Sequence, residues 1–387
     1  MHNYSTIFQQ LSALIPRWEF EQAVAAFQGN RYVKSFKCRS WFIANLYAQI
    51  SGKDSLREIE TALKTQKSKW YHLGLSNISR STLAHANQHR HYGICESLFY
   101  RFLARCRDLT PRHKFKFQNP LFALDASVID LCLSLFPWAE FRQKKGAVKL
   151  HCLLDYRGEI PNFLLLTEGR RHECRVAKEA QLPLSSDSII CFDKGYLDFE
   201  WLKSLDSRRI FFVTRAKNNA AYLVVGQQEI KSGKGVLADQ TIRLTSAETA
   251  LKYPGKLRLV TFYDREEKRT YRFLTNNFKL AASTIAEIYR ARWKIEIFFK
   301  WIKQNLKIKT FLGTSKNAVL TQIWTAMIYY LLLAYLKYQT KYAYSLLEFT
   351  RMIQATLFER IQLIDLLSLR TFEGLKIKPQ LNQTLLF

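Results

Sequence analysis

Apolar residues recur with helical spacing over "EIYRARWKIEIFFKWIKQNL", which runs from Glu287 to Leu306. They lie three, four or seven positions apart, at Ile288, Ile295, Phe298, Phe299, Ile302 and Leu306. Because no Pro or Gly interrupts the stretch, the pattern predicts one amphipathic helix.

Four polar side chains lie beside the apolar stripe of this predicted helix. At about 100° per residue, an arc of roughly 60° contains Tyr289, Arg292, Glu296 and Lys303. One carboxylate is thus surrounded by cationic and phenolic groups at the edge of a buried face. The stretch also fits a solvated ladder of ion pairs four residues apart, made by Arg292, Glu296 and Lys300. The helical pattern by itself leaves both interpretations open.

The amino-terminal part of the chain is helical in its periodicity up to about Arg107. Asp54–Leu63 predicts a helix with Asp54 as its N-cap, and a break containing Gly74 follows. A long basic helical region then begins behind a serine cap, Ser79 or Ser81. This order fits a helix-turn-helix that binds DNA, and it equally fits a helical hairpin with no DNA role.

Two strand patterns each carry an aspartate. Residues 109–120 combine prolines and cations, so we place a domain boundary there. The apolar run that follows carries Asp125 in its middle, where a carboxylate is costly unless it is paired or binds a metal. A second apolar run, Ser188–Phe192, ends at Asp193. A capping or turn role is the ordinary alternative for an aspartate at a strand end.

The rest of the chain combines strand patterns with helical patterns. Residues 146–166 predict a hairpin whose turn contains Asp155, and residues 209–277 read as a succession of strands. Residues 318–336 form an apolar stretch just long enough to cross a bilayer. Three polar residues interrupt it and no second such stretch exists, so we expect a helix buried in the core. An amphipathic helix over 344–369 is expected to cover the same core.

Charge narrows the class of function. The 387 residues include 59 Lys and Arg against 32 Asp and Glu, which gives a formal net charge of +27. Such an excess indicates a polyanionic partner, most simply nucleic acid. We expect no membrane partner, because no cluster of basic residues adjoins an anchor or a lipidation site.

The cysteines and the short sequence motifs narrow the class of function further. The seven cysteines are scattered and never form C-x-x-C, which predicts reduced thiols in a cytosolic protein. The amino end lacks the pattern of a signal peptide. Glycine-rich nucleotide-binding motifs are absent, which disfavours dinucleotide and P-loop chemistry.

The spacing Tyr289-x2-Arg292-x3-Glu296-x6-Lys303 resembles the YREK motif of the IS4-family transposases, enzymes of the DDE class. The segments "LDAS" around Asp125 and "DKGY" from Asp193 resemble the settings of the two acidic residues that precede that motif. "FLTNN" before the helix is also similar to this group. "SLREIE", "YHLGL" and "SRSTLAHANQHR" resemble an amino-terminal domain that is believed to bind DNA in the family.

The resemblance implies an α/β catalytic core of the ribonuclease H type with a β-rich insertion over about 209–277, preceded by an all-helical domain. We therefore expect a helical DNA-binding domain over 1–110 and a catalytic domain over 119–387. The strand pattern alone supports only a mixed α/β protein with a helical amino-terminal domain.

The resemblance also implies roles for individual residues. Asp125, Asp193 and Glu296 are expected to be catalytic and to hold two Mg²⁺ or Mn²⁺ ions, for which hard oxygen ligands are suited. The expected DNA contacts are Tyr289, Arg292, Lys303, Trp293 and Lys300, with Lys294 as a further phosphate contact. Trp293 is expected either to stack on an unpaired base or to lie in the core.

The resulting prediction is a transposase that cuts DNA at the ends of an insertion sequence and joins them to target DNA. A homodimer is expected when two ends are brought together. A metal-dependent endonuclease without strand transfer is one alternative. A DNA-binding protein with a decayed catalytic centre is another, and the complete set of three acidic residues argues against it.

Overall fold

The computed structural model describes residues 5–142, 145–230, 235–341 and 345–366. The chain divides into two compact units, one made of residues 1–109 and 321–387 and the other of residues 110–320. Residues from 321 onward therefore group with the amino-terminal helices. The catalytic domain expected over 119–387 stays a prediction, because a division into compact units does not test where a catalytic domain ends.

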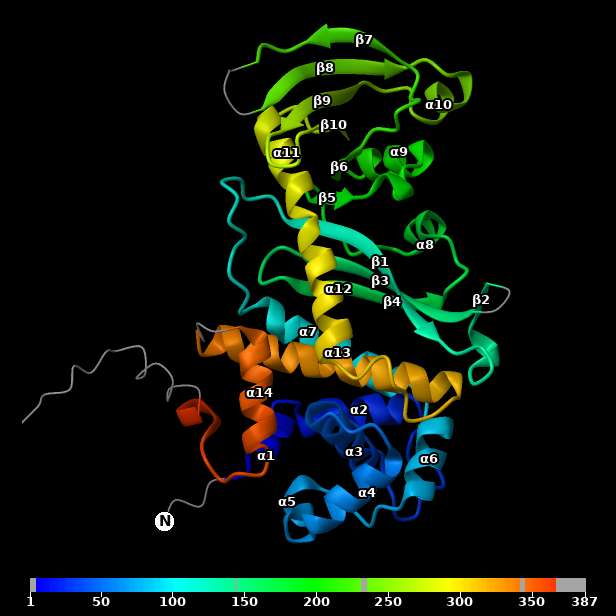
Figure 1. The fold of residues 1–387 in the computed structure, drawn as a ribbon, viewed down its shortest axis with the longest axis vertical. Coiled ribbons are helices and arrows are strands. Elements are labelled where there is room, and N and C mark those ends of the chain that lie inside the picture. Colours follow the sequence, from blue (N-terminus) through cyan, green and yellow to red (C-terminus); the bar gives the residue numbers. More distant parts are fainter. Residues whose placement is uncertain (1–4, 143–144, 231–234, 342–344, 367–387) are drawn as a thin grey trace, which may run out of the picture. The chain divides into compact units, whose positions relative to one another are not determined.

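The first unit is helical (Figure 1). Its amino-terminal helices are α1 (Ile7–Ala13), α2 (Arg17–Ala26), α3 (Cys38–Ser51), α4 (Leu56–Thr65), α5 (Trp70–Leu73), α6 (Arg80–His89) and α7 (Gly93–Arg107), with the short 3-10 helix η1 (Lys67–Lys69) before α5. Hydroxyl side chains begin several of them, because an oxygen at the N-cap accepts a backbone N–H that has no partner within the helix.

Two expected helix boundaries shift. The N-cap of α4 is Ser55, which accepts the N–H of Glu58, rather than Asp54. Ser79, not Ser81, caps α6. The long basic helical region expected behind the serine cap consists of two helices, α6 and α7, because Arg90 takes an extended backbone conformation and ends α6. Whether this part of the chain contacts DNA stays a prediction.

Helix α13 (Lys316–Gln339) explains the grouping of the carboxyl-terminal part with the helices. In its most apolar 18-residue window, 94% of the residues are buried. Within the helical unit its aromatic side chains pack on α7, with Trp324 5.2 Å from Phe99 and Tyr335 5.3 Å from Phe102 between ring centroids. A helix that is apolar on all sides requires cover on all sides, and α7 supplies part of it.

Helix α14 (Leu346–Thr356) closes the helical unit. Ser345 and Glu348 form a capping box at its start. Gln354 donates to the carbonyl of Ile50 in α3 at 2.8 Å. The helix is shorter than the expected span 344–369, of which residues 344 and 367–369 lie outside the described residues.

The second unit is built on one mixed sheet with the strand order β2-β3-β1-β5-β6-β10-β9-β8-β7, and β4 pairs with β3. The strands are β1 (Leu121–Leu131), β2 (Glu140–Arg142), β3 (Lys145–Asp155), β4 (Ile160–Glu168), β5 (Ile189–Phe192), β6 (Phe211–Arg215), β7 (Tyr222–Gln227), β8 (Val236–Leu244), β9 (Leu257–Asp264) and β10 (Arg269–Thr275). Strands β1, β5 and β6 are parallel, and the other pairings are antiparallel.

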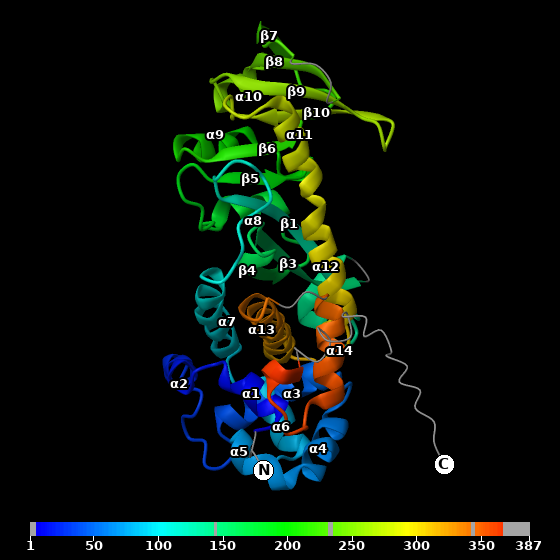
Figure 2. The same ribbon diagram turned by 90° about the vertical axis from the view of Figure 1, so that its left-hand side faces the viewer.

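Helices cover the sheet of this unit on both faces (Figure 2). On one face, α8 (Glu173–Glu179), α9 (Phe199–Ser207) and α10 (Ala247–Lys252) enclose an apolar core with side chains from β1, β5 and β6. The other face carries α11 (Ala282–Ala291) and α12 (Trp293–Asn305), which run end to end. The short 3-10 helices η2 (Pro137–Ala139) and η3 (Lys194–Tyr196) complete the unit. The expected hairpin is β3 and β4.

The segment expected to be a β-rich insertion over 209–277 holds β6 to β10, but it is not purely β. Helix α10 lies between β8 and β9, and β6 belongs to the parallel centre of the sheet. Strand β10 pairs with β6, so the antiparallel strands β7 to β10 extend the central sheet.

A buried ion pair holds this extension together. Arg258 of β9 donates to both carboxylate oxygens of Asp239 in β8, at 2.8 and 2.6 Å, and their side chains are only 2% and 6% exposed. Its Nη1 donates to the carbonyls of Asn277 and Leu280, at 3.0 and 2.6 Å. This guanidinium therefore ties two strands to the loop that leads into α11.

Asp239→Asn should lower the free energy of unfolding by about 3 kcal/mol or more, because it leaves a buried guanidinium without its counter-charge. The matched control is Asp187→Asn, which breaks an exposed pair with Arg209 whose side chains are 49% and 75% exposed. The control should cost about 1 kcal/mol or less. Urea unfolding of the two variants measures both, and equal losses would contradict the assignment.

Candidate active site

Two aspartates lie side by side at the centre of the sheet. Leu124 of β1 pairs with Phe192 of the parallel strand β5, and each is followed at once by an aspartate, Asp125 and Asp193. Leu124 and Phe192 belong to the apolar core on the face of α8 and α9. Because successive side chains alternate between faces within a strand, Asp125 points toward the opposite face, where α11 and α12 lie, while Asp193 follows the last residue of β5 and begins the turn η3.

The carboxylate of Asp125 is mostly buried. Its Oδ1 accepts the N–H of Ala126 at 2.8 Å, and its Oδ2 lies 3.5 Å from Nη1 of Arg292. Burial raises the pKa of Asp125 to about 6, and the nearby acids Glu173 and Glu296 add to the rise. The Ala126 hydrogen bond and the Arg292 charge lower it, but they do not compensate for the loss of hydration.

Asp193 is also an N-cap, the role that is common at a strand end. Its Oδ1 accepts the N–H of Gly195 at 2.9 Å and begins η3. One carboxylate oxygen is thereby fixed by the turn. The capping role uses only one of the two carboxylate oxygens, so it is compatible with the predicted catalytic role.

The helix expected as one unit from Glu287 to Leu306 is interrupted at Arg292, which separates α11 from α12. The N–H of Arg292 bonds to the carbonyl of Tyr289, and the N–H of Ile295 bonds to that of Arg292, both at 3.1 Å. These bonds span three residues instead of four, so the chain is tightened there. Arg292 keeps helical dihedral angles, so the helix direction continues.

Arg292 bridges two of the three predicted acidic residues. Its Nη2 donates to Oε1 of Glu296 at 2.6 Å, while Nη1 faces Asp125, and the guanidinium side chain is 13% exposed. Burial alone would lower the pKa of Arg292. Tyr289 and the carboxylates of Glu296 and Asp125 outweigh burial and raise that pKa. The arginine therefore stays charged and holds both carboxylates.

The predicted aromatic contacts differ in exposure. Tyr289 is buried, its ring centroid lies 4.9 Å from that of Phe273, and burial raises the pKa of its hydroxyl to about 12. Trp293 is 59% exposed, which argues against the core position considered for it. Both line a hollow of about 560 Å³ together with Phe262 and Tyr271.

The predicted lysines are not gathered with these groups. Lys300 is exposed. Lys303 is partly buried, and burial lowers its pKa, while Asp130 acts to raise it. Lys294 is engaged in an ion pair with Glu159 at 2.7 Å. The helix thus brings Tyr289, Arg292 and Glu296 together but leaves the lysines at separate places along α12.

Glu173 is an acidic neighbour of Asp125 that the sequence did not single out as a site residue. It lies in the first turn of α8 and raises the pKa of Asp125. It also forms a 3.4 Å ion pair with Lys149. Its only signal in the sequence is an acidic residue at the start of a helix that follows a hairpin.

The donor chemistry fits a hard divalent cation, because Asp125, Asp193 and Glu296 offer carboxylate oxygens. Within the described ranges, no three His, Cys, Asp or Glu residues are grouped closely enough to hold a metal. Arg292 supplies the cationic charge between two of the carboxylates instead. A metal ion shared by Asp125 and Glu296 therefore requires Arg292 to move.

The sequence and fold were compared with those of known proteins. A family model described as "Transposase DDE domain" matches residues 116–332, and one described as "Domain of unknown function (DUF4372)" matches residues 3–76. A putative transposase, y4zB, from Sinorhizobium fredii is 36% identical over 227 residues, which cover 58% of this chain and 63% of that relative. The match thus spans less than two thirds of that relative's length.

Two further relatives are named for insertion sequences. The probable transposase for element IS5377 of Geobacillus stearothermophilus is 29% identical, covering 69% of this chain and 70% of the relative. The putative transposase for element IS4SA of Synechocystis is 24% identical, covering 73% and 79%. A structure of a piggyBac transposase synaptic complex with hairpin DNA matches with a TM-score of 0.41 and 12% identity, over 67% of this chain and 55% of that chain. That likeness is too distant for an inference about this chain.

Asp125→Asn should stabilise the metal-free protein at pH 8 by up to about 3 kcal/mol. The folded state raises the pKa of Asp125 from 3.8 to about 6, so ionising this group costs stability progressively between about pH 4 and pH 6 and fully above that range. Asn removes the cost. Urea unfolding in a chelating buffer should show the gain at pH 8 and little difference at pH 3.5. A pH-independent difference, or a loss at pH 8, would contradict this account.

Proposed function

Because the chain belongs to the family of transposase DDE domains, we propose that it cuts DNA at the ends of an insertion sequence and joins those ends to target DNA. The resemblance to IS4-family transposases expected from the sequence is confirmed by the family match and by the relative named for IS4SA. One observation carries the proposed mechanism. Asp125 and Asp193 directly follow Leu124 and Phe192, which pair between two neighbouring parallel strands, and Asp125 is connected through Arg292 to Glu296.

The strand arrangement supports a core of the ribonuclease H type. The order β4-β3-β1-β5-β6, with β1, β5 and β6 parallel and β3 and β4 antiparallel, places the hairpin on one side of the central strand and the parallel crossovers on the other. The first aspartate then lies on the central strand β1, and the second lies at the end of its parallel neighbour. This finer assignment of the fold is part of the proposal.

Membership in this family implies dependence on a divalent metal ion in general terms. Asp125, Asp193 and Glu296 are the residues that would hold it, and we propose two Mg²⁺ or Mn²⁺ ions. When bound, such ions activate an attacking oxygen and neutralise charge on the departing one.

The chain's own residues would position the phosphate. Arg292 carries its charge beside Asp125 and Glu296, where a planar guanidinium can contact two phosphate oxygens. The hydroxyl of Tyr289 has no hydrogen-bond partner among the described residues, so it is available to donate to a phosphate oxygen. The high pKa of Tyr289 keeps that proton in place at neutral pH.

The chemistry has two steps. In cleavage, a water oxygen bonds to phosphorus, the P–O3′ bond breaks, and the released 3′-oxygen takes up a proton. In strand transfer, the freed 3′-hydroxyl of the element end bonds to a phosphorus of the target and loses its proton. The target's own P–O3′ bond breaks, and its 3′-oxygen gains a proton, so one phosphodiester replaces another.

The exposed side chains of α12 suit the DNA contacts that the sequence predicts. Trp293 presents its ring for stacking on an unpaired base, and Lys300 is free of ion pairs among the described residues. Lys303 is a less accessible contact. Double-stranded DNA as partner, a homodimer that joins two ends, and a cytoplasmic location belong to the same proposal.

An endonuclease without strand transfer would use the same carboxylates, so the two functions separate only on the joining step. A decayed DNA-binding protein is disfavoured, because Asp125, Asp193 and Glu296 are all present and two of them are coupled through Arg292.

Glu296→Gln should lower Mg²⁺-dependent cleavage of the element end by on the order of 10³-fold while DNA affinity is retained, because the amide keeps the shape but loses the charge of a metal ligand. Glu287→Gln, an exposed position on α11, is the matched control and should cleave like the wild type. Labelled DNA from the flanks of the gene provides the substrate. Undiminished cleavage by Glu296→Gln would remove the central assignment.

DNA affinity should fall steeply with salt, because binding to phosphates releases counterions and the net charge of +27 indicates many such contacts. A filter-binding or anisotropy titration between roughly 50 and 200 mM salt should lose about 10³-fold or more in affinity. A flat dependence would contradict the interpretation of the charge.

A further inference from the structure

A basic cleft of about 910 Å³ opens beside Asp193, on the side of the second unit formed by α8, the turn after β5, and the ends of β6 and β10. The cleft contains Asp193, Lys194 and Gly195, so whatever enters it reaches one of the proposed catalytic carboxylates. Its other residues come from three distant segments of the chain. The sequence pattern gave no reason to group them.

Most of the charge in the cleft is not neutralised by the protein. Two of its cations are engaged, since Lys178 pairs with Asp198 at 2.7 Å and Arg175 pairs with Glu179 at 2.8 Å. The others form no ion pair within the part of the chain that the structure describes, and they are Lys194, Arg215, Lys217, Arg269 and Arg272. Five cations without an ion pair surround one hollow whose lining includes a single carboxylate outside these pairs, that of Asp193, and this excess indicates a polyanionic occupant.

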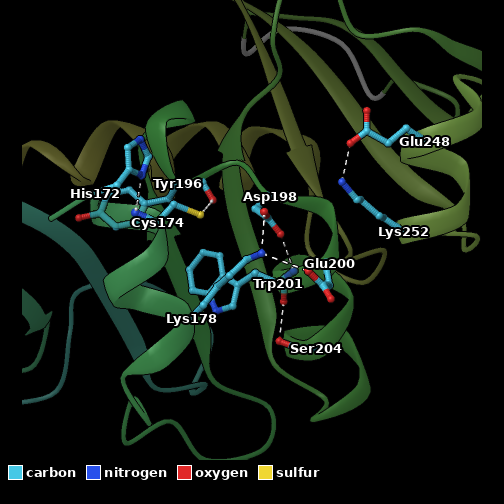
Figure 3. A network of polar contacts seen from close by, with 10 residues as sticks. All are labelled: His172, Cys174, Lys178, Tyr196, Asp198, Glu200, Trp201, Ser204, Glu248 and Lys252. Carbon is cyan, nitrogen blue, oxygen red and sulfur yellow. Dashed lines mark hydrogen bonds and ion pairs between the residues drawn. The ribbon is translucent and has the colours of Figure 1, made fainter.

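Contacts among α8, η3 and the start of α9 support one wall of the cleft. Figure 3 shows Lys178 of α8 bridging Asp198 and Glu200 at the start of α9, and Cys174 contacting the carbonyl of Tyr196 in η3. Asp198 also caps α9 through the N–H of Trp201. These contacts hold α8 against the turn that carries Asp193 and Lys194. The cations are therefore presented on a supported surface.

The opposite wall is organised by Arg272. Its Nη2 donates to the carbonyls of Lys217 and Asn218, which holds the loop after β6 against β10. The side chains of Lys217 and Arg269 are exposed and are left to contact a ligand. The cleft also presents Asn218, Asn219 and Thr270, whose polar side chains can donate to phosphate oxygens.

We propose that this basic cleft holds the sugar-phosphate backbone of the target DNA; this rests on the proposed transposase function. Strand transfer requires two DNA segments to meet at one set of carboxylates. The α11–α12 side, with Tyr289, Arg292 and Trp293, is the surface proposed for the element end. The cleft reaches Asp193 from the side of α8, and its cations are suited to contact phosphates, which carry no sequence information. Such contacts suit a target that is not chosen by base readout.

The test compares a double variant, Lys217→Ser with Arg269→Ser, with a matched control, Arg243→Ser with Lys279→Ser. The control removes two exposed cations of the same unit that lie outside the cleft. Wild type and variants are assayed in Mg²⁺ for cleavage of the labelled element end and for joining to a plasmid. Binding of a random-sequence duplex is measured separately as a function of salt.

The cleft variant should cleave the element end within about twofold of the wild type but join it to plasmid at least tenfold less well. Its salt dependence for the random duplex should fall by about two units of log-log slope, one for each lost phosphate contact, and the control should match the wild type. Joining equal to the control would overturn the proposal. An equal loss of cleavage and joining would also overturn it, because the cleft would then hold the element end.

Different results would contradict the transposase function and the cleft proposal. A wild type that neither cleaves nor joins the element end would contradict the transposase function, and the duplex-binding measurement would still decide whether the cleft binds DNA phosphates. An unchanged salt slope in the cleft variant would overturn the cleft proposal independently of any catalysis.

Discussion

The guanidinium of Arg292 lies between the carboxylates of Asp125 and Glu296, and the candidate site depends on this contact. Asp125 projects from the central strand of the sheet, and Glu296 projects from the helix that covers it. Without the guanidinium, the two carboxylates would repel each other in a place with little water. One buried cation permits both to be charged, and it ties α12 to β1. The same group is the one that must move if a metal ion is to occupy the space between them.

Strand β6 connects this centre to the rest of the second unit. It completes the parallel centre through β5 and begins the antiparallel extension through β10. Arg215 at its end lines both the aromatic hollow that contains Trp293 and the basic cleft beside Asp193. The extension strands therefore do more than lengthen the sheet. They supply walls for two surfaces that approach the carboxylates from different directions.

Local patterns in the sequence predicted the parts of the site that lie within single segments. An apolar run ending in or enclosing an aspartate predicted the strands of Asp125 and Asp193, and helical spacing predicted that Arg292 and Glu296 would meet. The tightening of the helix at Arg292 was missed, because no Pro or Gly marks it. Arg292, where the helix tightens, contacts Asp125 of the sheet, and helical periodicity does not report such tertiary contacts.

Features made by distant segments could not be predicted in this way. The cations of the basic cleft belong to α8, the turn after β5, β6 with the loop that follows it, and β10, and only the strand order brings them together. The grouping of α13 with the amino-terminal helices was missed for the same reason. Its apolar surface predicted burial, but the sequence does not say which helices cover it. The start of α4 is a smaller example of the same kind. Asp54 and Ser55 are adjacent and both can cap a helix, and the backbone conformation makes Ser55 the N-cap.

The measurement that tests the account most directly is localised cleavage of the protein by bound iron. Fe²⁺ replaces Mg²⁺ at carboxylate sites, and with ascorbate and peroxide it cuts the backbone nearest to the ion. The account predicts cuts near residues 125, 193 and 296 that excess Mg²⁺ suppresses and that Asp193→Asn weakens together. Cuts at unrelated places, or cuts at these places that persist unchanged in Asp193→Asn, would contradict a shared metal centre built from these three residues.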